Sequence, residues 1–378
     1  HGQWKVTVAV WMDREIIRIL PGEVRRYLGM AVDVGTTTLA AYLCDLGTME
    51  VLDTVSMMNP QCKYGEDVMS RISYHMSHED GLARMSRDII EALNQMVSEA
   101  CRETPGPGRE DGHGREGPGP EDILDMTIVG NTVMHHILLR LNPEFVGLAP
   151  FPPAIHRGLD IKARDLGIGI NPSAYVHVLP IEAGFVGADN VGVLLAEEPY
   201  KKDEMQLIID IGTNGELVLG NRERLISSSC ATGPALEGAQ LAFGMRAAPG
   251  ALERIKIDRE THEVDYKVIG RDAWRSYSRP EEMQAKGICG SGILDVFAEL
   301  YAAGVILKGG RFNPEQRSKR FRRNPETRHA EFVIAWAEET SIGKDVVITQ
   351  KDIRQIQLAK GALYCGCKLM MKHMGINR

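Results

Sequence analysis

Two pairs of apolar runs, each interrupted by a polar glycine turn, dominate the hydrophobic pattern of this chain. In the first pair, apolar residues 30–32 and 39–43 flank a turn at 33–38. In the second, the runs 207–211 and 217–219 flank a turn rich in Gly, Thr and Asn. A strand, a polar glycine turn and a second strand are typical of a β-hairpin. The pattern therefore predicts two hairpins half a chain apart.

Other stretches have the periodicity of helices. Apolar residues recur every three or four positions between 82 and 101, which predicts a helix with one face in the core. A short apolar run at 126–129 predicts a strand, followed by a helix that continues to Leu141. Near the C-terminus, Thr349 and Asp352 have the spacing of a helix cap. The chain is therefore expected to be of mixed α/β class.

Two segments differ from this pattern. Residues 104–122 contain six Gly and four Pro in nineteen positions, which predicts a mobile loop remote from any binding cleft. Residues 1–27 hold two apolar stretches before Pro21-Gly22, which predict the last strands of an upstream linker domain. The segment that starts at His1 has no initiator Met and no basic region leading into an apolar one, so we expect it to be neither a secretory signal nor a natural terminus.

Length, charge and cysteine content exclude several classes of protein. A length of 378 residues predicts two or three domains. Lys and Arg number 44 against 51 Asp and Glu, and the net charge of -7 disfavours nucleic-acid or anionic-membrane binding. No apolar run reaches about 18 residues, the length of a transmembrane helix. Seven cysteines predict reduced thiols and a cytoplasmic location rather than a disulfide framework.

The two turns repeat each other. Three residues of the first recur in the second at one offset of 177: Asp33, Gly35 and Thr36 align with Asp210, Gly212 and Thr213. One such turn is a weak signal, but two between strand-like runs indicate two related lobes.

The chemistry of these turns favours a phosphate site. Backbone N–H groups and hydroxyls bind phosphate oxygens, and glycine permits close approach. A carboxylate beside phosphate oxygens and water is a usual setting for Mg²⁺. We therefore expect Asp33 and Asp210 to hold Mg²⁺ through water. The expected phosphate-binding residues are Gly35, Thr36, Thr37, Thr38, Gly212, Thr213, Asn214 and Gly215. The alternative is two ordinary Asp-Gly hairpins, which the repetition disfavours.

Strand-Asp-x-Gly-Thr-strand, found twice, resembles the phosphate motifs of the acetate and sugar kinase, heat-shock chaperone and actin superfamily. Longer strings look like one branch, the ATP-dependent reductive activators of corrinoid proteins. The resemblance covers about residues 20–372. It rests on GMAVDVGTTTLAAYL, MMNPQCKYGEDVMSRI, IVGNTVMHHILL, LPIEAGFVGADNVGVLLA, IIDIGTNGELVLG, SSCATGPALEGAQLAFGMRAAPGA, GICGSGILDVFAEL and ITQKDIRQIQLAKGA.

This resemblance implies an α/β fold with two RNase-H-like lobes around an ATP cleft. We place the first lobe at 28–204 and the second at 205–378, with 104–122 as an insertion. The implied activity is ATP hydrolysis coupled to reduction of a Co(II) corrinoid to Co(I) on a partner protein of a methyltransferase system. A homodimer remains open.

The family's electron carrier resembles a plant-type ferredoxin domain with a [2Fe–2S] cluster. No C-x₄-C-x₂-C spacing occurs in this chain. The chain also stops where a Gly-rich adenosine motif is expected. We therefore expect a fragment truncated at both ends, with the cluster and the entry point for the electron donor on a domain outside it.

Several further residues have two interpretations each. Glu216 either orients the attacking water or a Mg²⁺-bound water, or is an exposed carboxylate at a strand start. Asp189 either supports Mg²⁺ or, slightly favoured, caps a helix. Asn131 either brings a helix start to phosphate or simply caps that helix. The strand-free turn with Gly290, Ser291 and Gly292 either faces the nucleotide or starts a helix.

The remaining chemistry-bearing residues favour structural roles. Cys365 and Cys367 lie about 200° apart on a helix and cannot chelate one ion together. The adjacent His135 and His136 are expected to pack in the core or at the surface. A basic cluster at 317–328 predicts a solvated loop, and the alternative is a docking patch for an acidic partner.

Two other functions remain open on the sequence alone. A small-molecule kinase of the same superfamily needs an acceptor site and a phosphorylated product. An actin-like filament or scaffold needs nucleotide-dependent assembly, which sedimentation measures.

Overall fold

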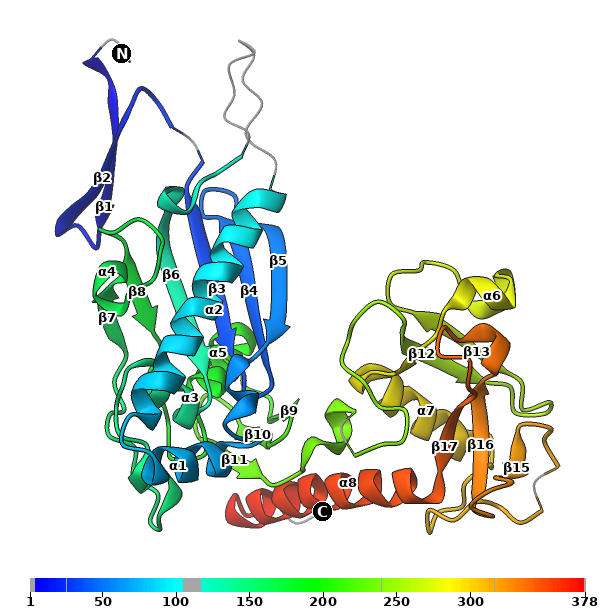
Figure 1. Ribbon diagram of the computed structural model, residues 1–378. Coiled ribbons are helices and arrows are strands. Elements are labelled where there is room, and N and C mark those ends of the chain that lie inside the picture. The colour runs from blue at the N-terminus through cyan, green and yellow to red at the C-terminus, as the bar shows by residue number, and fades with distance from the viewer. Residues whose placement is uncertain (1–3, 25, 105–116, 239, 316, 377–378) are drawn as a thin grey trace. The chain divides into compact units, whose positions relative to one another are not determined.

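Two compact units make up the chain, residues 1–203 and 204–378. The computed structural model describes residues 4–24, 26–104, 117–238, 240–315 and 317–376 (Figure 1).

A six-stranded sheet forms the centre of the first unit. Its order is β5-β4-β3-β6-β8-β7, with parallel pairing of β3 with β6 and of β6 with β8, and antiparallel pairing elsewhere. The predicted first hairpin is confirmed as β3 and β4, and the predicted strand at 126–129 as β6. The bounds are β3 Leu28–Val34, β4 Thr38–Asp45, β5 Glu50–Met58, β6 Ile123–Gly130, β7 Leu159–Lys162 and β8 Tyr175–Val178.

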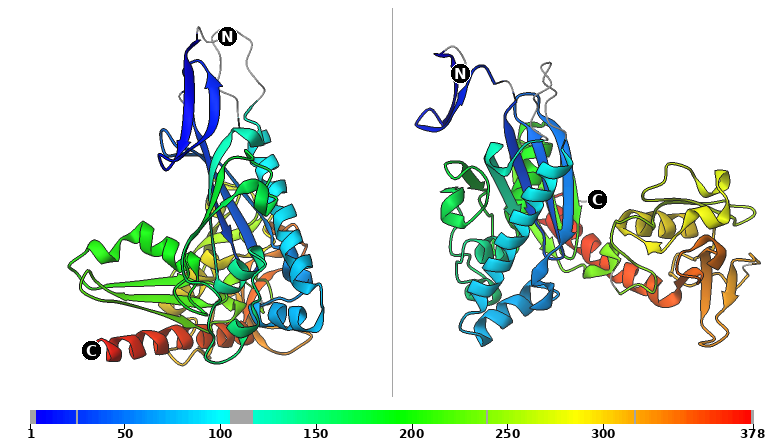
Figure 2. Two further views of the ribbon diagram at one scale, coloured as in Figure 1. Left: turned by 90° about the vertical axis from the view of Figure 1, so that its left-hand side faces the viewer. Right: turned by 45° about the horizontal axis from the view of Figure 1, so that its top comes forward.

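The predicted helix at 82–101 is confirmed as α2, which lies along one face of this sheet (Figures 1 and 2). Its apolar stripe is buried, and Met85, Ile89 and Met96 have no exposed surface. The other helices of this unit are α1 Val68–Ser77, α3 Thr132–Leu138, α4 Ala163–Leu166 and α5 Ala188–Glu197, and α2 spans Gly81–Glu103.

The helix predicted to reach Leu141 ends earlier, at Leu138. Arg140 has a φ of 55°, a left-handed conformation that an α-helix does not contain. Pro143 follows shortly after and disfavours a helical conformation at the residue before it.

A two-stranded hairpin, β1 (Val6–Trp11) and β2 (Glu15–Pro21), contacts the edge of the sheet through polar and aromatic side chains. The Trp11 ring stacks on Tyr175 at 3.8 Å between centroids, and Glu15 pairs with Lys162 at 2.8 Å. Arg18 Nη2 pairs with Asp122 Oδ1 at 2.7 Å.

Part of the predicted mobile loop is ordered. Pro120–Asp122 forms a 3₁₀ turn, and Asp122 is anchored by its pair with Arg18. Thr104, at the other end, is buried and donates its hydroxyl to Ala100 O at 2.8 Å. Both ends of the predicted loop are therefore held by polar contacts, although its composition provides no apolar side chains that could anchor it. Residues 105–116, the remainder of the predicted loop, lie outside the described residues.

The second unit contains three small sheets. The predicted second hairpin is confirmed as β9 and β10, which form a sheet of order β11-β10-β9. Two further sheets, β13-β12-β14 and β15-β16-β17, pack with α7 around a second core. The strands are β9 Gln206–Ile211, β10 Gly215–Gly220, β11 Leu225–Cys230, β12 Ala251–Ile257, β13 Val264–Val268, β14 Gly287–Ile288, β15 Phe321–Arg323, β16 Ala330–Ala335 and β17 Val346–Thr349.

The helices of this unit are α6 Pro280–Met283, α7 Gly290–Ala302 and α8 Gln350–His373. The predicted cap of α8 is confirmed, because Thr349 and Asp352 form a reciprocal capping box. The N-terminal part of α8 contacts the second core through Ile353, and its C-terminal part packs Met370 against β10 and β11. One long helix therefore connects the hairpin with the rest of the second unit.

Among the described residues, no helix is both long and apolar enough to cross a bilayer. All seven cysteines are free thiols.

Candidate functional site

The first polar turn joins β3 to β4. β3 ends at Val34 and β4 begins at Thr38, so residues 35–37 connect the two strands, and the exposed Asp33 is the second-last residue of β3. β3 and β6 are parallel, with Val34 beside Gly130, so their carboxyl ends meet where the turn lies. In open α/β sheets, ligands bind outside this edge.

Asn131 links α3 to this turn. Its Oδ1 accepts the N–H groups of Val133 and Met134, each at 3.1 Å. Its Nδ2 donates to Thr36 Oγ1 at 2.8 Å. Asn131 therefore caps α3, and the structure adds a direct contact between the cap residue and a threonine of the turn, while its role at a phosphate stays a prediction.

The second turn joins β9 to β10. β9 ends at Ile211 and β10 begins at Gly215, so residues 212–214 form a connection of the same length as the first. Asp210 and Glu216 face each other as cross-strand partners. Glu216 Oε1 also accepts from Ser229 Oγ on β11 at 3.2 Å.

Two carboxylates lie side by side in this second hairpin, because cross-strand partners have Cβ atoms about 5 Å apart. Asp210 is half-buried, and burial raises the pKa of its carboxyl group while a hydrogen bond from the Ile211 N–H partly opposes the rise. Like charges this close disfavour each other's ionised form. A bound divalent cation removes that penalty, and carboxylate oxygens are the donors that Mg²⁺ prefers. The donor set of Asp210 and Glu216 thus fits Mg²⁺.

Three polar side chains that the sequence analysis did not single out contact the turns from the interior. In the first unit, Asn59 Nδ2 donates to Gly35 O at 2.7 Å, and Arg71 Nη2 donates to Thr36 O. In the second, Thr232 Oγ1 lies 2.9 Å from both Gly212 O and Thr213 O. Asn59 and Arg71 belong to the string MMNPQCKYGEDVMSRI, but nothing in their spacing indicated that they meet the turn.

Asp189 does not cap α5, because the helix begins at Ala188 with Gly187 as its N-cap. The Asp189 Oδ1 accepts the N–H of Asn190 at 2.8 Å. A Cβ added at Gly187 would lie 2.5 Å from the Cα of Asn131, so the start of α5 packs directly against the residue that contacts the first turn. Asp189 therefore lies in the second position of a helix that begins beside Asn131.

The turn at 287–292 is not strand-free, because Gly287–Ile288 forms the short strand β14 beside β12. A Cβ at Gly290 would lie 2.8 Å from Leu236 O, and one at Gly292 would overlap Leu252 O. Both glycines thus permit close packing at the start of α7, while Ser291 is exposed.

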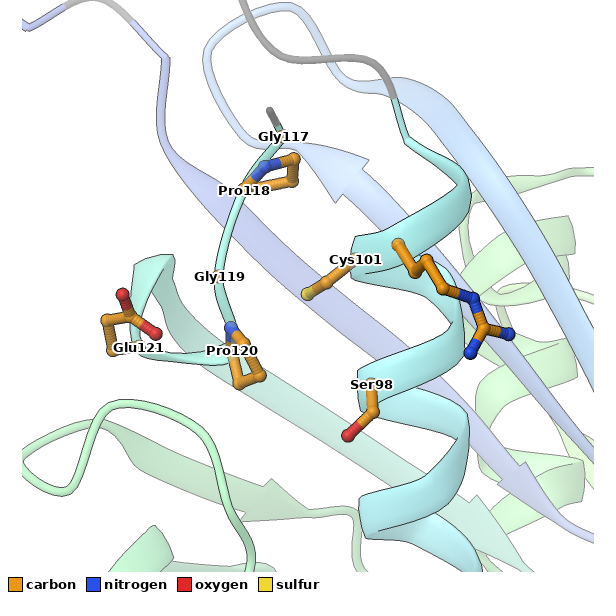
Figure 3. A pocket seen from close by; sticks show the side chains of 8 residues that line it. Ser98, Cys101, Gly117, Pro118, Gly119, Pro120 and Glu121 are labelled. Carbon is orange, nitrogen blue, oxygen red and sulfur yellow. The ribbon is translucent and has the colours of Figure 1, made fainter. Parts of the chain in front are cut away.

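A hollow of about 590 Å³ lies elsewhere in the first unit, between the end of α2 and the segment that leads into β6 (Figure 3). Cys101 lines it, and burial raises the pKa of that thiol to about 11. β6 begins at Ile123 and ends at Gly130 beside the first turn, so eight residues separate the hollow from the turn by about 25 Å. The hollow therefore does not contribute to the candidate site.

The basic cluster is not a uniformly solvated loop. Arg320 is 1% exposed and pairs with Glu263 at 2.9 Å. Arg322 pairs with Glu331 and Asp345, at 2.8 and 2.7 Å. These carboxylates come from neighbouring strands and loops that are distant in sequence, which is why the run of charges alone did not reveal them.

The two adjacent histidines are buried, as the core interpretation predicts. His136 is fully buried and accepts the Ala154 N–H at Nε2, 2.9 Å away. His135 is 3% exposed, and its ring nitrogens have no hydrogen-bond partner among the described residues. Burial lowers the pKa of His135 to about 4, so its ring is neutral at pH 7.

Comparison with known proteins matches both units to one family. Residues 28–202 match the family described as the RACo middle region, and residues 204–378 match the family described as the C-terminal domain of RACo, the ASKHA domain. The two matches together cover the chain from residue 28 onward, apart from residue 203.

Curated relatives are similar over most of this chain. The corrinoid activation enzyme RamQ of Eubacterium limosum is 38% identical over an alignment of 354 residues, and the match covers 92% of this chain and 55% of that protein. A Methanosarcina barkeri reductase of the Co(II) methylated amine-specific corrinoid protein is 25% identical over an alignment of 372 residues, and the match covers 92% of this chain and 60% of that protein.

A solved structure of a reductive activator for corrinoid, iron-sulfur protein has a TM-score of 0.81 with this chain at 34% identity. The match covers 96% of this chain and 54% of that one. The chain thus spans little more than half the length of the proteins that it matches. The mixed α/β class with an ASKHA fold is confirmed, and an ASKHA domain implies nucleotide binding.

Proposed function

This chain belongs to the RACo family, whose middle region and ASKHA domain it spans, and we propose that it is the ATP-hydrolysing part of a reductive activator of corrinoid proteins. The observation that carries this proposal is the repeated turn, with an aspartate at the end of one strand and Gly-Thr at the start of the connection, in both units of an ASKHA-family chain. A phosphate site needs backbone N–H groups, hydroxyls and a carboxylate for the metal in one place. Both turns supply all three.

The residues have the following roles in this proposal. Asp33 and Asp210 would hold Mg²⁺ through water, and the ion would supply neutralisation of the phosphate charge. Glu216, opposite Asp210, orients the attacking water. The phosphate contacts come from the two turns, and Asn131, Asp189 and the Gly290–Gly292 turn lie around the rest of the nucleotide. Phosphoryl transfer to water depends on positioning and charge neutralisation, which are the roles that the proposal gives these groups.

Hydrolysis is proposed to change the conformation of the activator and to remodel the bound corrinoid protein. One electron from a low-potential donor then reduces Co(II) to Co(I), a transfer that is uphill without ATP. We propose that this electron arrives through a ferredoxin-like domain with a [2Fe–2S] cluster, outside these 378 residues. Among the described residues, no group of three His, Cys, Asp or Glu side chains is arranged to hold a metal ion. Seven free thiols fit a reducing, cytoplasmic setting.

The hydrolytic step is tested with the intact protein, MgATP and no acceptor. We expect phosphate release that requires Mg²⁺ and ATP, with no phosphorylated small molecule among the products. Phosphate transfer to an added sugar or carboxylic acid, in place of release to water, would instead identify a kinase and reject this proposal.

A further inference from the structure

Carbonyl groups at equivalent positions of the two turns are bound from the interior side. In the first turn these are the carbonyls of Gly35 and Thr36, and in the second those of Gly212 and Thr213. These pairs are related by the same offset of 177 that relates Asp33 to Asp210. Both units therefore fix the same two peptide groups in their turns, although they use different side chains.

The donors come from corresponding places in the two units. Asn59 directly follows β5, the third strand of the first antiparallel series. Thr232 lies two residues after β11, the third strand of the second. Arg71 is added from α1 in the first unit only. The segment after the third strand thus turns back under the turn between the first two strands in both units.

All three donors are buried: Asn59 and Arg71 have no exposed surface, and Thr232 is 6% exposed. Arg71 also donates to Gly65 O at 3.1 Å and to Gln61 Oε1 at 3.2 Å. None of these acceptors is a carboxylate, and the nearby charge of Asp67, the N-cap of α1, partly compensates the guanidinium. A buried cation is costly unless an anion compensates its charge. The guanidinium lies directly beneath the first turn, so an anion bound on the outer side of the turn would add to that compensation.

The orientation of the N–H groups follows from peptide geometry. A trans peptide directs its carbonyl and the following N–H in opposite directions. With the carbonyls of residues 35 and 36 held inward, the N–H groups of Thr36 and Thr37 point outward. The same argument directs the N–H groups of Thr213 and Asn214 outward in the second turn. Successive N–H groups aimed to one side form an anion-binding concavity.

We propose that Asn59, Arg71 and Thr232 are positioning residues that hold the two turns with their N–H groups directed at the phosphates of the nucleotide. This inference rests on the proposed ATP site. None of the three needs to contact the nucleotide, because each acts through the peptide groups that it holds. Holding the peptide groups in this way would reduce the turn ordering that has to accompany phosphate binding.

Thr232 offers the cleanest test, because Thr232→Val removes the hydroxyl at nearly constant volume and Thr232→Ser retains it. The chain provides a matched control: Thr340 is 8% exposed, and its Oγ1 likewise lies 3.0 Å from two carbonyls, those of Ala337 and Lys344. Thr340→Val therefore loses the same kind of hydrogen bond outside the turns. Thermal unfolding and calorimetric titration with MgATP are measured for all variants of the intact protein.

We expect Thr232→Val and Thr340→Val to lower stability similarly, while only Thr232→Val weakens MgATP binding, by about tenfold or more. Thr232→Ser should bind within about threefold of wild type. Equal MgATP affinity of the two valine variants would overturn the positioning role and leave the ATP site standing. A wild-type protein that binds no MgATP would instead reject the proposed function, and the positioning role with it.

Variants of Arg71 test whether the charge of this side chain contributes to MgATP binding at the first turn. Arg71→Lys keeps the cation, and Arg71→Met keeps much of the length without the charge. We expect Arg71→Lys to bind MgATP more tightly than Arg71→Met. The opposite order would contradict the electrostatic part of the argument, and the Thr232 series tests the geometric part where Arg71→Met does not fold.

Discussion

Replacement of Asn131 separates the two interpretations that the sequence leaves open for this residue. Asn131→Ala loses the N-cap of α3, worth about 1 kcal/mol, and the hydrogen bond to Thr36 Oγ1, worth about 1 kcal/mol more. We therefore expect the free energy of unfolding to fall by about 2 kcal/mol. Asn131→Asp retains the cap, since aspartate is as good an N-cap as asparagine, and its second carboxylate oxygen can accept a hydrogen bond from the Thr36 hydroxyl in place of the lost amide donor. Its stability should therefore stay within about 0.5 kcal/mol of wild type.

For nucleotide binding, we expect Asn131→Asp to be impaired although its stability is close to that of wild type. A carboxylate at residue 131 would stand beside Thr36, and its repulsion with a phosphate charge about 6 Å away costs about 3 kcal/mol at an effective dielectric constant of about 20. Asn131→Asp should thus weaken MgATP binding by about 100-fold while leaving urea unfolding nearly unchanged.

Asn94 provides the matched control in the same unit. It accepts the Gly169 N–H at 2.7 Å and donates to Gly167 O at 3.0 Å, so Asn94→Ala removes a comparable pair of hydrogen bonds. Its MgATP affinity should equal that of wild type. If Asn131→Asp also binds MgATP with wild-type affinity, Asn131 is a helix cap only and the placement of phosphate beside Thr36 is refuted.

Further predictions concern stability. A Cβ at Gly366 would overlap the Cys230 sulfur and lie 2.7 Å from Leu217 Cδ1, whereas nothing lies within 4 Å of one at Gly361 on the same helix. Gly366→Ala should therefore lower the free energy of unfolding by about 2 kcal/mol and Gly361→Ala should raise it by about 0.5–1 kcal/mol, as urea denaturation measures; a gain in stability for both would refute the packing described for α8. Because burial lowers the pKa of His135 from 6.5 to about 4, protonation favours the unfolded state. Stability should be fully present above about pH 6.5 and should fall by about 3 kcal/mol as the pH drops to about 4. His135→Leu should lose that part of the pH dependence, and an unchanged profile would contradict the burial argument.

The sequence predicted the elements with local signals. The two hairpins were visible as apolar runs around glycine turns, α2 as a 3.6-residue repeat, and the start of α8 as the Thr349–Asp352 capping pair. Each of these signals arises within a few residues, so periodicity and capping chemistry suffice to find it. The predicted helix after β6 extended too far, because Arg140 adopts a left-handed conformation that its residue type does not reveal.

The side-chain contacts that hold the two turns could not be predicted from the sequence. Arg71 reaches Thr36 across 35 positions, and Thr232 reaches Gly212 across 20. Buried polar side chains of this kind are fixed by tertiary structure, and nothing periodic marks them. Arg320 is a second example. Its run of basic residues predicted a solvated loop, yet its partner Glu263 lies 57 positions away in the sequence.

The central claim is that ATP hydrolysis at these turns drives reduction of a Co(II) corrinoid. The most direct measurement is the absorbance of Co(I) formed on a partner corrinoid protein, with the intact activator, a low-potential reductant and MgATP. Asp210→Asn is the informative variant, because it preserves shape while removing the carboxylate opposite Glu216.

We expect wild type to form Co(I) only when hydrolysable ATP is present, with phosphate released in parallel. Asp210→Asn should bind the corrinoid protein normally but lose about 100-fold or more in both ATP turnover and Co(I) formation. Co(I) formation at the wild-type rate without ATP, or by Asp210→Asn, would contradict the account.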